Sequence, residues 1–297
     1  ACRLLFEMPG ARTASNVFSF SAVISACGRC GQWQIALQLL LGMPAAGVLL
    51  NEFSYNAGIS ACEKGGQWQV ALLLLLQMPS ARATPDDISY NAGISACEKG
   101  GQWQMALVLL SGLRSASIPP DEISFSAAIS ACEKAGEWQV ALLLLSGMPA
   151  AKAVPNEVSF SAGISACEKG GQWQMALVLL SHLHSASIVP DVISSSAAIS
   201  ACERGGQWQL ALLLLSGMAA AAVVLNVISF NACVSACQKA GQWQMALLVL
   251  SAMPAARVVP NETTLSAGVS ACEQGGRLRI ALQLLSGVPA AILPVLC

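Results

Sequence analysis

The sequence predicts an all-α protein, an α-solenoid of 35-residue helix-turn-helix repeats. Eight cysteines recur at a constant step of 35 residues, at Cys27, Cys62, Cys97, Cys132, Cys167, Cys202, Cys237 and Cys272. The tryptophans keep the same step, at Trp33, Trp68, Trp103, Trp138, Trp173, Trp208 and Trp243. A fixed period of this length is typical of solenoids, in which each unit buries its apolar face against its neighbours. We therefore expect no domain boundary inside the array.

The repeats follow one another along nearly the whole chain. Residues 1–16 look like the second half of a preceding repeat, as though the chain were a piece of something longer. The array then runs through Val17–Asn51, Glu52–Asp86, Asp87–Asp121, Glu122–Asn156, Glu157–Asp191, Val192–Asn226, Val227–Asn261 and a degenerate final unit, Glu262–Leu296. Positions within each repeat are numbered 1 to 35 below.

The repeat Glu52–Asp86 illustrates the expected helix pair. Its first helix runs through Phe53–Lys64 and stops at Gly65 and Gly66, because glycine is the usual residue where a helix ends in a left-handed turn. Its second helix runs through Gln67–Met78, which is rich in strong helix formers. Pro79 ends this helix, because proline cannot continue the hydrogen-bond ladder.

The composition is apolar, with 55% hydrophobic and 10% charged residues, yet no membrane insertion is predicted. The aliphatic run Val70–Leu76 is far shorter than the roughly 20 residues that a spanning helix needs, and we interpret it as a buried helix face. Small residues on the first helix, Ala57, Gly58 and Ala61, let the leucine-rich second helix approach closely.

The spacing of the cysteines argues against metal sites and disulfides. Metal sites need ligands close together, and the near pairs, Cys27 with Cys30 and Cys233 with Cys237, look incidental. We expect reduced, buried cysteines. The tryptophans are expected to pack between helices, with a platform that stacks a ligand as the alternative.

The residues of the repeat resemble a known family. Glu52–Asp86 has an aromatic residue at position 4, Asn at 5, Lys at 13, Gly at 15, Ala-Leu at 20 and 21, Met at 27 and Pro-Asp at 34 and 35. Together with the length of 35, this pattern resembles the pentatricopeptide repeat. The resemblance implies a right-handed superhelix that binds single-stranded RNA with one repeat per base, other RNA-processing proteins as further partners, and a place in a chloroplast or mitochondrion.

The resemblance also assigns roles to four positions on the concave side. Positions 5 and 35 read the base edge, position 2 sandwiches the base, and position 13 approaches the phosphate. Position 13 carries Arg29, Lys64, Lys99, Lys134, Lys169, Arg204 and Lys239, so a chain of net charge −1 can still present a basic stripe. Position 12 carries Glu63, Glu98, Glu133, Glu168, Glu203 and Glu273, so a solvated, self-neutralising face is the alternative.

Position 2 is apolar in every repeat but the last, with Phe18, Phe53, Ile88, Ile123, Val158, Ile193 and Ile228 followed by Thr263. Flat or branched apolar groups on both sides of a base would hold it without distinguishing which base it is. The alternative is that these side chains belong to the core.

Positions 5 and 35 vary within a narrow polar set. The pairs are Ser21 with Asn51, Asn56 with Asp86, Asn91 with Asp121, Ser126 with Asn156, Ser161 with Asp191, Ser196 with Asn226, and Asn231 with Asn261. Asp only accepts hydrogen bonds and suits the ring N–H of G and U, whereas Asn can donate to the ring nitrogen of A and C. The short Ser leaves room for a purine and the longer Asn favours a pyrimidine. Helix capping by these residues is the alternative.

Read with the parallel polarity of the family, these pairs predict the site 5′-AUUAGAY-3′. The last repeat pairs Ser266 with Leu296, and we expect it to cap the array and read nothing. The nearest competing family, the tetratricopeptide repeat, has a period of 34 residues and would bind a peptide in its groove. An enzyme, a metal or a cofactor is not predicted, because His182 and His184 are the only histidines and no zinc-deaminase motif accompanies them.

Overall fold

The computed structural model describes residues 17–221, 223–277 and 279–281. The chain divides into two compact units, Ala1–Pro155 and Asn156–Cys297. Our expectation of no domain boundary inside the array stays a prediction. The division falls between the fourth and fifth repeats, and each unit is described by itself. A solenoid permits such a division, because each repeat packs only on its neighbours. The right-handed twist implied by the resemblance stays a prediction.

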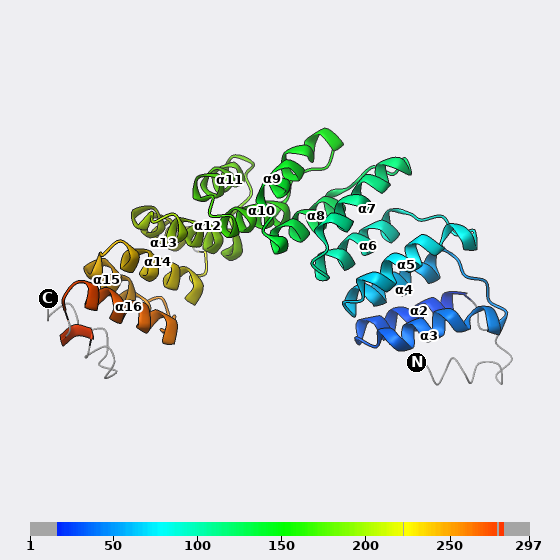
Figure 1. The fold of residues 1–297 in the computed structure, drawn as a ribbon, viewed down its shortest axis with the longest axis horizontal. Helices are drawn as coiled ribbons and strands as arrows, with labels where there is room; N and C mark the ends of the chain where they lie inside the picture. The colour runs from blue at the N-terminus through cyan, green and yellow to red at the C-terminus, as the bar shows by residue number, and fades with distance from the viewer. Residues whose placement is uncertain (1–16, 222, 278, 282–297) are drawn as a thin grey trace. The chain divides into compact units, whose positions relative to one another are not determined.

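Each of the first seven repeats is a pair of helices, as predicted (Figure 1). In the first unit the pairs are α2 (Val17–Arg29) and α3 (Trp33–Gly42), α4 (Glu52–Lys64) and α5 (Trp68–Gln77), α6 (Asp87–Lys99) and α7 (Trp103–Ser115), and α8 (Glu122–Ala135) and α9 (Trp138–Gly147). In the second unit they are α10 (Glu157–Lys169) and α11 (Trp173–Ser185), α12 (Val192–Arg204) and α13 (Trp208–Ala220), and α14 (Val227–Lys239) and α15 (Trp243–Ala252), followed by α16 (Glu262–Gln274).

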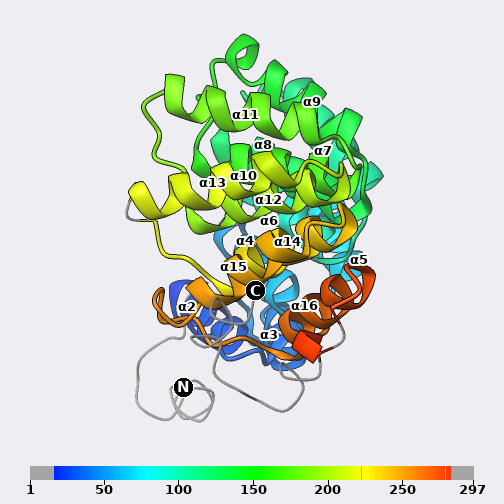
Figure 2. The same cartoon turned by 90° about the vertical axis from the view of Figure 1, so that its left-hand side faces the viewer.

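The helices of each unit form two layers. The first helices pack directly on one another, α2 on α4 on α6 on α8 in one unit and α10 on α12 on α14 on α16 in the other (Figures 1 and 2). Within each unit, each second helix packs on the first helix of its own repeat and on the first helix of the repeat that follows it in that unit. In the described part of the chain, successive second helices do not pack closely on each other. The layer of first helices is therefore the more tightly packed one and forms the inner side of each unit.

The residue at position 28 sets the length of the second helix. Where it is proline, as at Pro44, Pro79 and Pro149, the α-helix ends two residues before it and a short 3₁₀ turn begins at the proline (Pro44–Ala46, Pro79–Ala81, Pro149–Ala151). Where it is not proline, as in α7, α11 and α13, the α-helix continues for three more residues. Proline lacks the N–H that the helix needs and therefore ends it.

The first helix ends as predicted. Lys64 is its last residue, and Gly66 then adopts a φ of +68°, which favours glycine. Gly58, in the middle of this helix, lies where a Cβ would approach Leu40 to 2.7 Å and Leu74 to 3.4 Å. The small residue therefore allows the close approach of the leucine-rich helices that the sequence indicated.

The regular spacing of tryptophan has a packing explanation. Trp68 opens α5 and lies on Gly100 of the following repeat, where a Cβ would stand 2.3 Å from Trp68 Cδ1. The same contact joins Trp33 to Gly65, Trp173 to Gly205, and Trp243 to Gly275. The prediction that the tryptophans pack between helices is confirmed, because each of these rings fills the space beside a glycine of the following repeat.

Two repeats, the sixth and the eighth, lack the aromatic residue of position 4. Phe125 and Phe230 are among the largest fully buried side chains, and the ring of Tyr90 lies 3.2 Å from the place of a Cβ on Gly112. The corresponding residue in the sixth repeat is Ser195. A mostly apolar pocket of about 400 Å³ opens beside it, lined in part by Gly217, the counterpart of Gly112.

Candidate nucleic-acid interface

Position 35 is the N-cap of the next repeat's first helix. The side chain of Asp121 accepts a hydrogen bond from the Ser124 backbone N–H at 2.8 Å, and the Ser124 hydroxyl oxygen accepts one from the Asp121 N–H at 2.8 Å. Reciprocal bonds of this kind form a capping box. The same box is built on Asn51, Asp86, Asn156, Asn226 and Asn261, whereas Asp191 caps through the side-chain bond to Ser194 N–H. The capping role considered as the alternative for position 35 is therefore real.

The same side chains lie against position 5 of their own repeat. Asn56 Nδ2 lies 3.1 and 3.2 Å from the two carboxylate oxygens of Asp86, and Asn91 Nδ2 lies 3.3 and 3.1 Å from those of Asp121. The other such pairs are Ser161 Oγ to Asp191 Oδ1 at 3.3 Å, Ser196 Oγ to Asn226 Oδ1 at 3.3 Å, and Asn231 Nδ2 to Asn261 Oδ1 at 3.4 Å. Residues 30 apart in sequence thus form one polar pair in each of these repeats.

The hydrogen bonds within a pair leave one acceptor and one donor available to a ligand. Asp86 Oδ1 is occupied by the Ser89 N–H at 2.8 Å, and Asn56 Oδ1 accepts from the Ser89 hydroxyl at 2.6 Å. Asp86 Oδ2 keeps a free lone pair and Asn56 Nδ2 keeps a second hydrogen. An acceptor beside a donor matches a uracil edge, which offers a ring N–H next to a carbonyl oxygen.

The predicted pairs of the first, fourth and eighth repeats differ from these five pairs. Ser21 Oγ is buried and has no hydrogen-bond partner in the part of the chain that the structure describes. Ser126 and Asn156 belong to different units. Leu296, predicted to pair with Ser266 in the last repeat, lies outside the described residues.

The apolar side chains at position 2 are exposed and are not part of the core. Their exposed fractions are Phe18 68%, Phe53 60%, Ile88 59%, Ile123 62%, Val158 58%, Ile193 64% and Ile228 61%. The core alternative for this position is thereby wrong. The rings of Phe18 and Phe53, from adjacent repeats, lie 6.0 Å apart at a tilt of 45°. These two rings are in contact with each other, so they would have to separate to about 7 Å to enclose one flat group from both sides.

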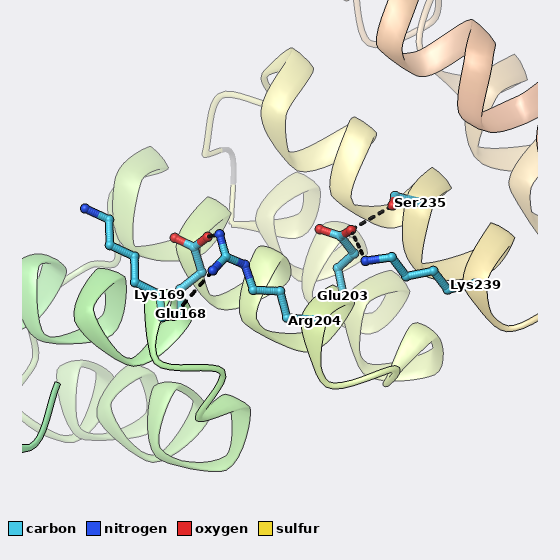
Figure 3. A network of polar contacts seen from close by, with 6 residues as sticks. All are labelled: Glu168, Lys169, Glu203, Arg204, Ser235 and Lys239. Carbon is cyan, nitrogen blue, oxygen red and sulfur yellow. Dashed lines mark hydrogen bonds and ion pairs between the residues drawn. The ribbon is translucent and has the colours of Figure 1, made fainter. Parts of the chain in front are cut away.

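The cations at position 13 are all exposed, but most of them form ion pairs with carboxylates. Four of them pair with the glutamate at position 12 of the preceding repeat: Lys99 with Glu63 at 2.7 Å, Lys134 with Glu98 at 2.9 Å, Arg204 with Glu168 at 2.8 Å, and Lys239 with Glu203 at 2.8 Å. Figure 3 shows the pairs of Arg204 and Lys239. The self-neutralising face considered as an alternative therefore exists, and it joins one repeat to the next. Exposed pairs contribute little stability, so a phosphate could compete for the cation.

Helical geometry brings these positions onto one face. At 100° per residue, positions 2, 9 and 13 of a first helix lie within about 40° of one another, and position 5 lies about 60° to one side. Position 35 joins this face through its bond to position 5. Five first helices, α4, α6, α10, α12 and α14, thus present an apolar side chain, a polar pair and a cation along one stripe of the inner layer.

The cysteines take no part in this face. Burial raises the pKa of the Cys62, Cys97, Cys167 and Cys202 thiols to about 11, so they stay protonated and unreactive near neutral pH. Among the described cysteines Cys30 is exposed and the others are buried, which confirms the buried cysteines that the sequence predicted. The described residues contain no group of three or more His, Cys, Asp or Glu side chains suited to a metal ion. None of their helices is long and apolar enough to span a membrane.

Fold and interface together define an α-solenoid that displays a polar pair on its inner layer in five of its repeats. The chain belongs to the pentatricopeptide repeat family. Residues 18–48, 53–82 and 123–151 match the family's PPR repeat, and residues 213–274 match the pentatricopeptide repeat domain. The competing tetratricopeptide assignment is thereby set aside. No curated protein sequence matches the chain.

Solved structures of pentatricopeptide repeat proteins share the fold. The protein PPR10 from maize is 24% identical, with a TM-score of 0.69 over 96% of this chain and 41% of PPR10. PPR10 in complex with an 18-nt psaJ RNA element is 20% identical, with a TM-score of 0.58 over 99% and 48% of the two chains. The PPR domain of protein-only RNase P 1 from Arabidopsis thaliana, in complex with tRNA, is 17% identical, with a TM-score of 0.51 over 58% and 91%. This chain thus spans less than half of PPR10.

Proposed function

We propose that this chain binds single-stranded RNA in a sequence-specific manner, with one base read by each repeat. The observation that carries the proposal is the polar pair between positions 5 and 35. Five pairs with a measured bond repeat at the same place on the inner layer, and each contains only Ser, Asn or Asp. A pair that varies in hydrogen-bonding character while its geometry stays constant is what a base-by-base reader requires.

The surroundings of the pair support the same function. The exposed side chains of position 2 can stack on either face of a base, and such stacking does not discriminate between the four bases. The cations of position 13 lie on the same stripe of the helix and can reach the backbone. The solved structures of PPR10 and of the RNase P domain in complex with RNA lend further support to this proposal.

The predicted site is 5′-AUUAGAY-3′, with the first repeat at the 5′ end. Asn56 with Asp86 and Asn91 with Asp121 select U, because an acceptor meets the ring N–H of the base. Ser196 with Asn226 selects A, because Asn226 Nδ2 has no acceptor among the described residues and can donate to a ring nitrogen. We place this activity in organellar RNA processing or stability, without a catalytic role for this chain.

Selection from a random RNA pool with the purified protein tests the proposal. We expect recovered RNAs to share a motif that matches AUUAGAY at five or more positions. Recovery of RNAs without a shared motif would contradict sequence-specific recognition. Failure to retain any RNA, together with retention of peptides on the same column, would favour the peptide-binding scaffold.

A further inference from the structure

The ladder of ion pairs between positions 12 and 13 is interrupted at the first repeat. Position 12 there is Gly28, whereas the following repeats through the sixth have glutamate. A Cβ on Gly28 would lie 2.8 Å from Ala61 Cβ, so the close packing of α2 on α4 excludes a longer side chain. Lys64, which follows at position 13 of the second repeat, pairs with no carboxylate among the described residues.

An intact step of the ladder shows what is missing at Gly28. The carboxylate of Glu203 accepts a hydrogen bond from Ser235 Oγ at 2.7 Å and one from Lys239 Nζ at 2.8 Å (Figure 3). These donors stand at positions 9 and 13 of the repeat that follows Glu203. One hydroxyl and one ammonium group therefore hold one anionic group between two repeats.

The second repeat presents the same donors to an open pocket. Ser60 and Lys64 are the counterparts of Ser235 and Lys239, and Gly28 is the counterpart of Glu203. A pocket of about 260 Å³ lies at this place, lined also by Ser25 and Arg29. Water occupies about 30 Å³ per molecule, so the pocket has room for a tetrahedral phosphate group.

The other interruption of the ladder lacks the cation. Position 12 of the seventh repeat is Gln238, and a pocket there is lined by Glu262, Thr263, Ser266 and Ser270. The residue at position 13 of the eighth repeat is Gln274. That pocket carries a carboxylate in place of a lysine and an arginine, so it offers no comparable place for an anion.

We infer that the pocket between the first and second repeats is a preformed phosphate site, which takes the phosphodiester group joining the first two bases of the bound RNA. Its donors, Ser60 and Lys64, stand at the two positions that hold a carboxylate elsewhere in the chain. Lys64 can bind the phosphate without breaking an ion pair, whereas Lys99 must first break its ion pair with Glu63. The strongest backbone contact therefore lies at the 5′ end of the site. The identity of the occupant rests on the proposed RNA-binding function.

Matched variants test the site on RNA. We expect Lys64→Gln to weaken binding of the AUUAGAY RNA about fivefold at about 0.1 M salt, because one phosphate contact contributes about 0.7 to the salt slope. Lys99→Gln, at the same position but paired with Glu63, should weaken binding less than Lys64→Gln does. Glu63→Gln, which frees Lys99, should strengthen binding about fivefold. Equal losses for Lys64→Gln and Lys99→Gln would overturn the inference while leaving RNA binding intact.

A methylphosphonate linkage identifies the phosphate. A neutral linkage between the first and second bases should weaken binding by the full chain but not by Lys64→Gln, whereas one between the third and fourth bases should affect both proteins equally. Equal sensitivity of both proteins to the first linkage would refute this position for the contact.

Inorganic phosphate tests the pocket without RNA. In two-dimensional NMR of the full chain at constant ionic strength, sodium phosphate should shift the amide signals around Ser60 and Lys64, and leave those around Ser235 and Lys239 unchanged. Lys64→Gln should abolish these shifts. Shifts without any RNA binding would support the site and reject its RNA occupant. Absent shifts, or equal ones at Ser235, would reject the site.

Discussion

Replacing Asp121 with asparagine tests whether this side chain recognises a base in addition to capping α8. Asp121 Oδ1 caps α8 through the Ser124 N–H at 2.8 Å, and both carboxylate oxygens lie near Asn91 Nδ2. The substituted asparagine would keep the capping oxygen, because Asn and Asp are equally good N-caps, and Asn51 and Asn261 build the same box in this chain. We therefore expect Asp121→Asn to leave the melting temperature nearly unchanged.

The change in base preference follows from the group that is exchanged. The second oxygen of Asp121 becomes an NH₂ group, so an acceptor for the ring N–H of U becomes a donor for the ring nitrogen of C. The pair Asn231 with Asn261, bonded at 3.4 Å, shows that the fold accommodates two asparagines at this place. One mismatched contact costs about 1–3 kcal/mol, which corresponds to a shift in U over C preference of about 5-fold to 150-fold at the third base.

Fluorescence anisotropy with labelled AUUAGAC and AUCAGAC RNAs at one salt concentration measures this shift. Asp121→Ala serves as the control, because it removes the cap as well and should lower stability by about 0.5–2 kcal/mol. If Asp121→Asn weakened binding to both RNAs equally, or changed neither affinity, then the residues at position 35 would be caps and not readers.

Further changes test the electrostatics and the packing. The logarithm of RNA affinity should fall with the logarithm of salt concentration at a slope no steeper than about −5, from about −0.7 for each of the position-13 cations, and a slope near zero would contradict phosphate binding. Gly100→Ala should lower the unfolding free energy in urea by about 1–3 kcal/mol through its clash with Trp68, whereas Gly147→Ala, with open space around its Cβ, should not lower it; equal losses would refute the packing explanation. Ser195→Phe should fill the neighbouring pocket and raise the unfolding free energy by about 0.5–2 kcal/mol, and a loss of stability would show that the pocket cannot admit a ring.

The helix pairs could be predicted because their signals are local. Gly66 needs a positive φ and Pro79 lacks an N–H, so each acts on its own turn of the chain. The predicted first helix, Phe53–Lys64, begins one residue after the observed start at Glu52. The lengthening of α7 beyond α5 follows the same local chemistry, since position 28 is Arg114 in one and Pro79 in the other.

The ion-pair ladder could not be derived from one repeat. Glu63 and Lys64 are adjacent in sequence, yet they lie about 100° apart on their helix and do not pair with each other. Glu63 instead pairs with Lys99, which is 36 residues further along the chain and stands on the next helix of the stack. Its partner depends on how closely α4 and α6 pack, and that distance is set by buried residues far from the charges. The sequence could therefore predict a row of cations but not which of them would be free.

Position 35 also has a consequence for how such a protein changes over generations. Its cap on the next helix is served equally by Asn51 and by Asp86, while the two side chains offer different groups to a ligand. A lineage can therefore exchange one for the other without passing through an unstable ancestor. Under the proposed function, specificity and foldability are separable at this position, so new targets would be acquired one base at a time by an array that stays folded throughout.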